Sequence, residues 1–221
     1  MENGNFTDLS YADKIALAKT YVETAISCFD INAVIAKTEF CNIARTDVLP
    51  LTEVPTLETE ECAITNFVYQ GSYNICWAAC VATIVNYKKG YSLTAGNVAT
   101  KMGHNYTADD YAGASLSETV SALSRYGLTY GSSGKLSWSN VKSRINADQP
   151  FIVCIEEGSI NAGHMLTGYG YSCQYGDSEV DADSRYLQVW DPNGAKRSFS
   201  YYASSYSLYG YSWTWTYTIV D

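Results

Sequence analysis

Apolar residues recur at helical spacing in the first part of the chain. Between residues 10 and 27 they stand three or four positions apart, which places them on one face of a helix. These residues are Ile15, Ala18, Tyr21, Val22, Ala25 and Ile26. A weaker pattern predicts a second helix over 31–44, and the prolines and acidic residues that follow are typical of an extended linker. The sequence therefore predicts a helical N-terminal extension with an acidic linker over residues 1–65, and a separate domain over residues 66–221.

A nearly continuous apolar run opens the second region. Residues 75–87 are apolar at almost every position, which is the pattern of a helix that the core surrounds on all sides. Gly90 is expected to end this helix. The sequence Ser-Leu-Ser-Glu at 115–118 fits the start of another helix, which Gly127 ends. A further short helix is expected over 138–147.

The pattern changes to strands after Pro150. Short runs rich in β-branched and aromatic residues cover 151–155, 164–169, 186–190 and 212–220. The last run alternates aromatic and polar residues, which predicts a strand with one buried face. Because the helices come first and an antiparallel sheet follows, the predicted fold class is α+β.

Composition and charge reduce the number of possible function classes. Hydrophobic residues make up 47% of the chain and charged residues 17%, as in a folded globular protein. A net charge of -9 without a Lys or Arg cluster argues against a nucleic acid or an anionic membrane as partner. No run approaches the ~20 apolar residues that span a bilayer, and the N-terminus lacks the basic and apolar regions of a signal peptide.

The seven cysteines are many for a cytosolic protein, and their odd number leaves one unpaired if the others form disulfides. The sequence offers 15 pairings for the other six and no basis for choosing among them. The spacing gives weak support to a zinc site, and neither a metal nor another cofactor is expected. A run of alternate acids has the oxygen ligands for calcium, but it lacks the glycine and glutamate of the usual calcium loop, so a solvated loop is favoured. These acids are Asp177, Glu179, Asp181 and Asp183.

Four residues have the chemistry of thiol catalysis. A thiolate that attacks a carbonyl needs a base, a group that orients the base, and donors for the developing oxyanion. Cys76 opens the buried helix, whose dipole lowers the pKa of a thiol. Gln70 lies six residues upstream with an amide that can donate. His164 begins a strand, after Gly163, which lets a substrate backbone approach closely.

Asp191 is the candidate for the orienting group. It follows the strand that ends in Trp190, and the neighbouring strand would bring its carboxylate beside His164. Asn193 is a rival for the same role, and Asp191 could instead serve only as the first residue of the Asp-Pro-Asn-Gly turn. Trp77 and Trp190 flank the proposed nucleophile and acid, where they either wall a substrate cleft or belong to the core.

These motifs carry a resemblance to a known family. Gln-x5-Cys-Trp at the mouth of a helix, a later Gly-His at the start of a strand, and an acid after the next strand resemble the papain superfamily of cysteine peptidases over residues 66–221. The spacing is most similar to compact bacterial members, including staphopain-like secreted proteases and peptidases that remove double-glycine leaders. The leader peptidases usually have Asp-Cys-Gly at the nucleophile, whereas this chain has Ile75-Cys76-Trp77.

The resemblance implies a fold, an activity and a location. It implies a helical subdomain with the nucleophile, packed on an antiparallel sheet or half-barrel with the histidine and aspartate. Cys76 would attack peptide or isopeptide bonds and form a thioester, with His164 as base, Asp191 as orienting group and Gln70 as oxyanion donor. It also implies a protein or peptide substrate, a secreted bacterial enzyme, and an N-terminal segment that inhibits the site. The alternative for residues 1–65 is a helical extension that serves stability only.

Two other functions fit the same residues. A transglutaminase-like enzyme or an amidase would use the same triad on another acceptor or substrate, although the Gln-x5-Cys spacing favours a protease. A catalytically inactive domain could bind peptides, but the intact set of four residues argues against it. The other histidine, His104, lies in a polar loop where solvent exposure is expected.

Overall fold

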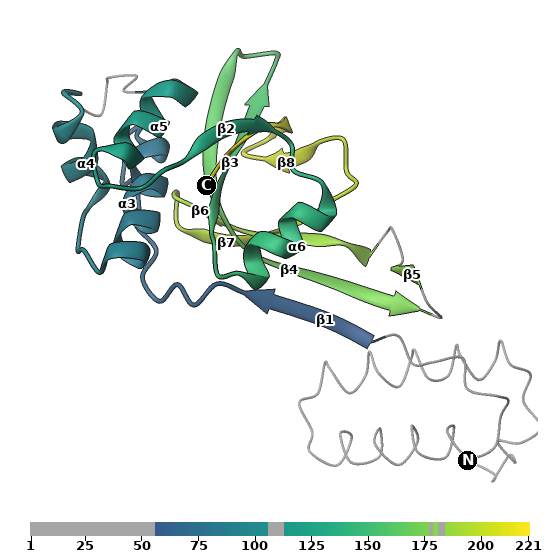
Figure 1. Cartoon of the computed structure of the whole chain (residues 1–221). Helices are drawn as coiled ribbons and strands as arrows, with labels where there is room; N and C mark the ends of the chain where they lie inside the picture. Colours follow the sequence, from purple (N-terminus) through teal and green to yellow (C-terminus); the bar gives the residue numbers. More distant parts are fainter. Residues whose placement is uncertain (1–55, 106–112, 177–178, 181–183) are drawn as a thin grey trace, which may run out of the picture. The chain divides into compact units, whose positions relative to one another are not determined.

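The computed structural model describes residues 56–221, except 106–112, 177–178 and 181–183 (Figure 1). The predicted helices over 10–27 and 31–44 lie outside the described residues, as does most of the run of alternate acids. Within the described part of the chain, no helix has the length and apolar character that crossing a membrane requires.

Helix α3, Cys76–Lys89, is the buried helix that the apolar run predicts. All ten residues from Trp77 to Asn86 are buried, so the helix has no solvent-facing side along most of its length. It ends where expected, because Gly90 adopts the left-handed conformation with φ 68° and its N–H donates to the carbonyl of Asn86.

Three shorter helices follow. Helix α5, Leu116–Ser124, begins with the predicted capping box between Ser115 and Glu118. Helix α6 covers Trp138–Asn146, close to the predicted range. Helix α4, Ala95–Lys101, was not predicted; a capping box between Thr94 and Asn97 starts it.

The strands form an antiparallel sheet around the long strand β4. They are β1 Thr56–Glu61, β2 Gly131–Gly134, β3 Phe151–Glu157, β4 Ala162–Gly176, β5 Glu179–Val180, β6 Tyr186–Asp191, β7 Ala195–Ser200, β8 Tyr206–Leu208 and β9 Tyr211–Val220. The main path runs β2-β9-β3-β4-β6-β7, while β1 and β5 also pair with β4, and β8 pairs with β9. This arrangement confirms the α+β, papain-like fold class.

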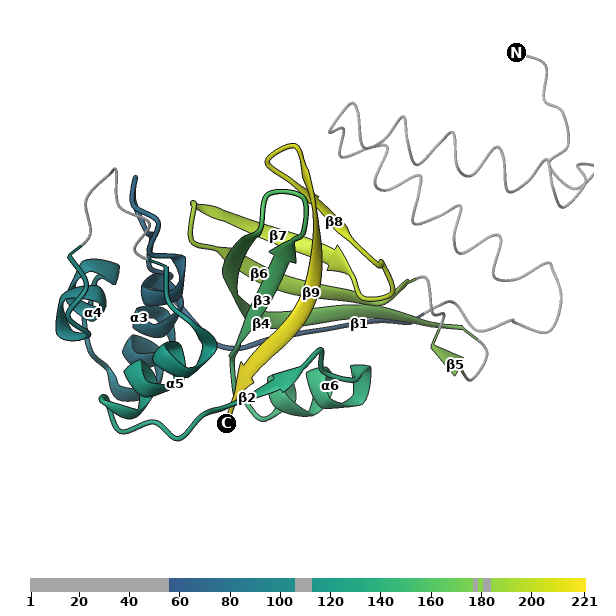
Figure 2. The same ribbon diagram turned by 90° about the horizontal axis from the view of Figure 1, so that it is seen from above.

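Strand β3 separates two apolar clusters. Ile152 and Cys154 face a cluster shared with α3, α4 and α5, whereas Phe151, Val153 and Ile155 face a second cluster with α6 and the aromatic residues of β9. Because side chains alternate along a strand and both faces are covered here, residues 151–155 of β3 are all apolar. Figures 1 and 2 show α3, α4 and α5 gathered beside the sheet, with α6 apart from them.

Part of the segment that the sequence analysis assigns to a linker is a strand. Strand β1 pairs with β4, from Thr56 opposite Tyr175 to Glu61 opposite Gly170. One acid of this segment, Glu58, accepts hydrogen bonds from Lys142 of α6 at 2.7 Å and from Tyr171 of β4 at 2.5 Å. The folded region therefore includes residues before the predicted boundary at 65.

Gly170 allows β1 to approach β4 closely. A Cβ atom there would lie 2.8 Å from Cγ of Glu61 and 2.9 Å from the carbonyl oxygen of Glu60. We expect Gly170→Ala to displace β1 and lower the free energy of unfolding by about 1–3 kcal/mol, measured by urea denaturation. Gly131→Ala is the matched control, because nothing lies within 4 Å of a Cβ at that strand position. Equal stability of the two variants would contradict this account.

Five cysteines lie in the described part of the chain, and all of them are free thiols: Cys62, Cys76, Cys80, Cys154 and Cys173. Cys28 and Cys41 lie outside the described residues. None of the five therefore forms a disulfide in this structure. For Cys28 and Cys41, disulfide formation stays a prediction.

Candidate active site

Cys76 is the first residue of α3, as the sequence predicts. The cap residue Ile75 forms no side-chain hydrogen bond to the helix, so the N–H groups of the first turn remain available. The backbone N–H groups of Trp77 and Met165 donate to the Cys76 sulfur. Burial by itself raises the pKa of the Cys76 thiol, but a hydrogen bond from His164, its positive charge and these two N–H groups outweigh burial and lower the pKa.

His164 bridges the thiol and a carboxylate. It lies on β4 opposite Ile155 of β3, and its Nε2 atom is 3.0 Å from Oδ1 of Asp191. Since Nε2 is used in this way, Nδ1 is the ring nitrogen left for the hydrogen bond with Cys76. Burial lowers the pKa of His164, but the bonds to Asp191 and Cys76 outweigh burial and raise the pKa to about 9.

Asp191 is the last residue of β6 and is fully buried. One carboxylate oxygen faces His164 and accepts the N–H of Asn193 at 3.0 Å. The other accepts from Nε of Arg197 at 2.8 Å and from the hydroxyl of Tyr209. Burial raises the pKa of Asp191, but these hydrogen bonds outweigh it and hold the pKa well below its usual range, so the carboxylate stays ionised.

The turn after β6 directs the side chain of Asn193, the other candidate for orienting His164, away from Asp191. The side chain of Asn193 donates to the Tyr209 hydroxyl at 2.8 Å, and only its backbone N–H contacts Asp191. The carbonyl of Asp191 also accepts the N–H of Gly194 at 2.8 Å. Asp191 thus starts the Asp-Pro-Asn-Gly turn and faces His164 at the same time, so the structural and catalytic interpretations are compatible.

Arg197 and Tyr209 are residues of this site that the sequence analysis missed. Arg197 lies on β7, two residues from Ala195, which pairs with Asp191, and side chains two apart on a strand share a face. This hairpin register is the signal that could have indicated Arg197. Tyr209 lies between β8 and β9, far from Asp191 in the chain, and no local pattern points to it.

The loop that carries Gln70 is attached to the end of β6. The backbone N–H of Gln70 donates to the carbonyl of Pro192 at 3.0 Å, and the indole of Trp190 donates to the carbonyl of Val68 at 3.1 Å. Nε2 of Gln70 donates to the carbonyl of Tyr73 at 2.8 Å. An amide nitrogen has two N–H groups, so this bond leaves one of them to donate elsewhere.

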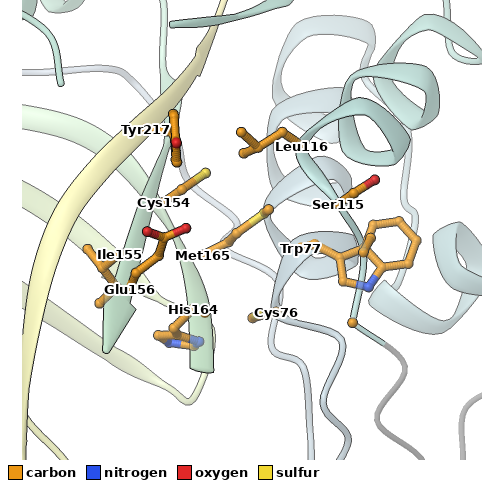
Figure 3. Close-up of a pocket in the computed structure, with 13 residues that line it drawn as sticks. Cys76, Trp77, Ser115, Leu116, Cys154, Ile155, Glu156, His164, Met165 and Tyr217 are labelled. Atoms are coloured by element: carbon orange, nitrogen blue, oxygen red, sulfur yellow. The ribbon is translucent and has the colours of Figure 1, made fainter. Parts of the chain in front are cut away.

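A cavity of about 490 Å³ lies beside Cys76 and His164 (Figure 3). Residues of α3, β3, β4, β9 and the segment entering α5 line it: Cys76, Trp77, Gly113, Ala114, Ser115, Leu116, Cys154, Ile155, Glu156, Gly163, His164, Met165 and Tyr217. Of the predicted substrate-binding residues, Trp77 and Gly163 line this cleft. Trp190 and Gln70 are not among the described lining residues, and Trp190 instead packs against Phe67 and Tyr69.

His104 has a different environment from the predicted one. It is half-buried, and its ring centroid is 5.1 Å from that of Trp77, so it contacts the helix that begins with Cys76. No set of three or more His, Cys, Asp or Glu side chains suited to a metal ion gathers within the described ranges.

A cysteine at the start of a buried helix, facing a histidine on an antiparallel sheet, is the arrangement of papain-like cysteine peptidases. The comparison with protein families agrees with this class, because the model of the Peptidase_C39 like family matches residues 58–218. This match covers more than half of the chain, and the chain belongs to that family of papain-like cysteine peptidases, which are hydrolases. The comparison with curated proteins gives no match.

Proposed function

We propose that the protein hydrolyses peptide bonds through a thioester on Cys76, with His164 as acid and base and Asp191 as the group that orients His164. The observation that carries this proposal is the position of His164, which hydrogen-bonds both the Cys76 sulfur and, at 3.0 Å, Oδ1 of Asp191. The raised pKa of His164 and the lowered pKa of Cys76 favour a thiolate–imidazolium pair at neutral pH.

The chemistry follows from this ion pair. The Cys76 thiolate attacks the carbonyl carbon of the scissile bond, and the carbonyl oxygen becomes an oxyanion. The His164 imidazolium then donates its proton to the leaving amine, which departs and leaves a thioester. A water molecule, deprotonated by His164, attacks the thioester and releases the carboxylic acid and the thiolate.

Two donors are proposed for the oxyanion. One is the backbone N–H of Cys76, because a first-turn N–H has no partner within its helix. The other is the second N–H of the Gln70 amide, whose first N–H is held by the carbonyl of Tyr73 at 2.8 Å. Two hydrogen bonds support this role, since they hold the loop of this amide beside the end of β6: the Gln70 N–H donates to the Pro192 carbonyl, and the Trp190 indole donates to the Val68 carbonyl.

Selective alkylation tests the proposal. We expect iodoacetamide at neutral pH to modify Cys76 at least about tenfold faster than the other described cysteines, because the thiolate is the reactive form. Burial raises the pKa of Cys62 and of Cys154 to about 12, and the pKa of Cys80 well above its usual value. Mass spectrometry locates the label, and cleavage of a peptide library measures activity.

Cleavage should stop when one equivalent of label has reached Cys76. Faster labelling of another cysteine, or full cleavage by protein alkylated at Cys76, would reject the proposed nucleophile. His104→Gln serves as a control for general damage, since it changes the chain's other histidine and should label and cleave like the native protein.

A further inference from the structure

Glu156 places a negative charge in the substrate cleft. It lies on β3 two residues after Cys154, so both side chains face the cleft, and Figure 3 shows its carboxylate on the same side of the strand as the Cys154 thiol. Its neighbour on β4 is Gly163. Because Gly163 has no side chain, and a Cβ there would come no nearer than 4.0 Å to the Ile155 carbonyl oxygen, the space beside Glu156 is open.

The carboxylate is exposed, and no Lys or Arg side chain of the described residues lines the cleft beside it. Neither a hydrogen bond nor an ion pair joins the Glu156 side chain to another of the described residues. Solvated carboxylates are common on protein surfaces, so what distinguishes Glu156 is its place in the lining of the cleft. Its charge faces whatever enters there.

The walls near Glu156 are apolar. Leu116, Met165 and Tyr217 line the same cavity, and Met165 is opposite Cys154 in the β3–β4 register. A side chain that fits such a site has a long apolar stem and a positively charged end, and among amino acids these are lysine and arginine. An acidic side chain would be repelled, and an apolar one would displace water from Glu156 without replacing its hydrogen bonds.

From this arrangement we infer that the enzyme selects peptides that carry Lys or Arg at the substrate position whose side chain enters the cleft beside Glu156. The inference rests on the proposed peptidase function and adds the substrate class. The net charge of -9 acts in the same direction, because it attracts basic peptides to the protein.

A positional-scanning peptide library tests the inference. Native enzyme should prefer Lys or Arg at one position near the cleaved bond, and Glu156→Gln should reduce that preference about two- to fivefold, the range of an exposed ion pair. Glu156→Lys should reverse it toward Asp and Glu. Glu60→Gln is the matched control, because it removes the same charge from an exposed position on β1 that does not line the cleft.

The outcomes separate this inference from the function on which it rests. Cleavage of the library without a basic preference, or an unchanged preference in Glu156→Gln, would overturn the inference and leave the peptidase function standing. The same loss of preference in Glu60→Gln would attribute it to net charge, and would also overturn the role of Glu156. If the native enzyme, with Cys76 reactive, cleaved no peptide, the proposed function would fail together with the inference.

Discussion

Alanine at Cys76, at His164, or at both positions is expected to reduce kcat/KM for peptide hydrolysis by the same large factor, about 1000-fold or more. In the proposed mechanism the two side chains form one thiolate–imidazolium pair, in which each depends on the other for its charge. Once either is removed, the second has no remaining function in the reaction, so the double variant should be no less active than the single ones. Initial rates at fixed pH and substrate concentration measure the effect.

Two controls accompany this experiment. Cys62→Ala changes a buried cysteine and His104→Gln changes the other histidine. Both variants should stay within a fewfold of native activity because neither residue lines the cleft. Thermal unfolding would establish that the variants are folded. If the loss in the double variant equalled the product of the two single losses, the residues would act independently and the proposed pair would be wrong.

The fold elements that the sequence predicts best are those in which burial and local signals agree. The apolar run of α3 has the left-handed Gly90 at its end, and α5 begins with a capping box at Ser115. Residues 151–155 of β3 are all apolar because both faces of the strand are covered there. In each case the burial pattern and the local signal indicate the same element, so the sequence alone predicted it.

The elements that were missed depend on contacts between distant segments. Strand β1 is acidic and has the composition of a linker, and it is a strand because β4 offers it a pairing edge and Lys142 pairs with Glu58. Helix α4 has only seven residues, and its capping box uses Asn97 in place of an acid. Composition and periodicity say little about such short or edge elements.

The residues of the site also divide into those that the sequence predicts and those that depend on the fold. Motif spacing pointed to Cys76, His164 and Asp191, and the structure brings these three together. Motif spacing could not point to Tyr209, which contacts Asp191 from the β8–β9 connection. It also could not distinguish the two roles considered for Trp190, whose indole bonds the carbonyl of Val68 in the loop before the nucleophile. These roles arise from the chain's path in space.

The contacts at the end of β6 connect the two halves of the proposed machinery. Through Pro192 and Trp190, this strand end holds the loop that carries Gln70, and through Asp191 it holds His164. The proposed oxyanion donor and the proposed base are therefore attached to the end of the same strand. This attachment favours the pre-organisation that electrostatic stabilisation of a transition state requires.

Asp191→Asn should reduce kcat/KM about 100-fold or more and move the alkaline limit of activity to lower pH. In the native protein the imidazolium persists up to a pKa of about 9, so hydrolysis should decline only above that pH, where His164 can no longer protonate the leaving amine. An amide at 191 removes the negative charge, and burial then acts without opposition and lowers the pKa of His164. The unpaired guanidinium of Arg197 lowers it further.

The matched control for this change is Asn193→Ala, which removes the rival side chain but keeps the backbone N–H that Asp191 accepts at 3.0 Å. It should lose less than about fivefold in kcat/KM, because its amide contacts only Tyr209 among the residues of this site. Adding Arg197→Gln to Asp191→Asn should raise the alkaline limit again, since it removes a cation that opposes the imidazolium. A larger loss in Asn193→Ala than in Asp191→Asn, or an alkaline limit that does not move in Asp191→Asn, would show that another residue orients His164.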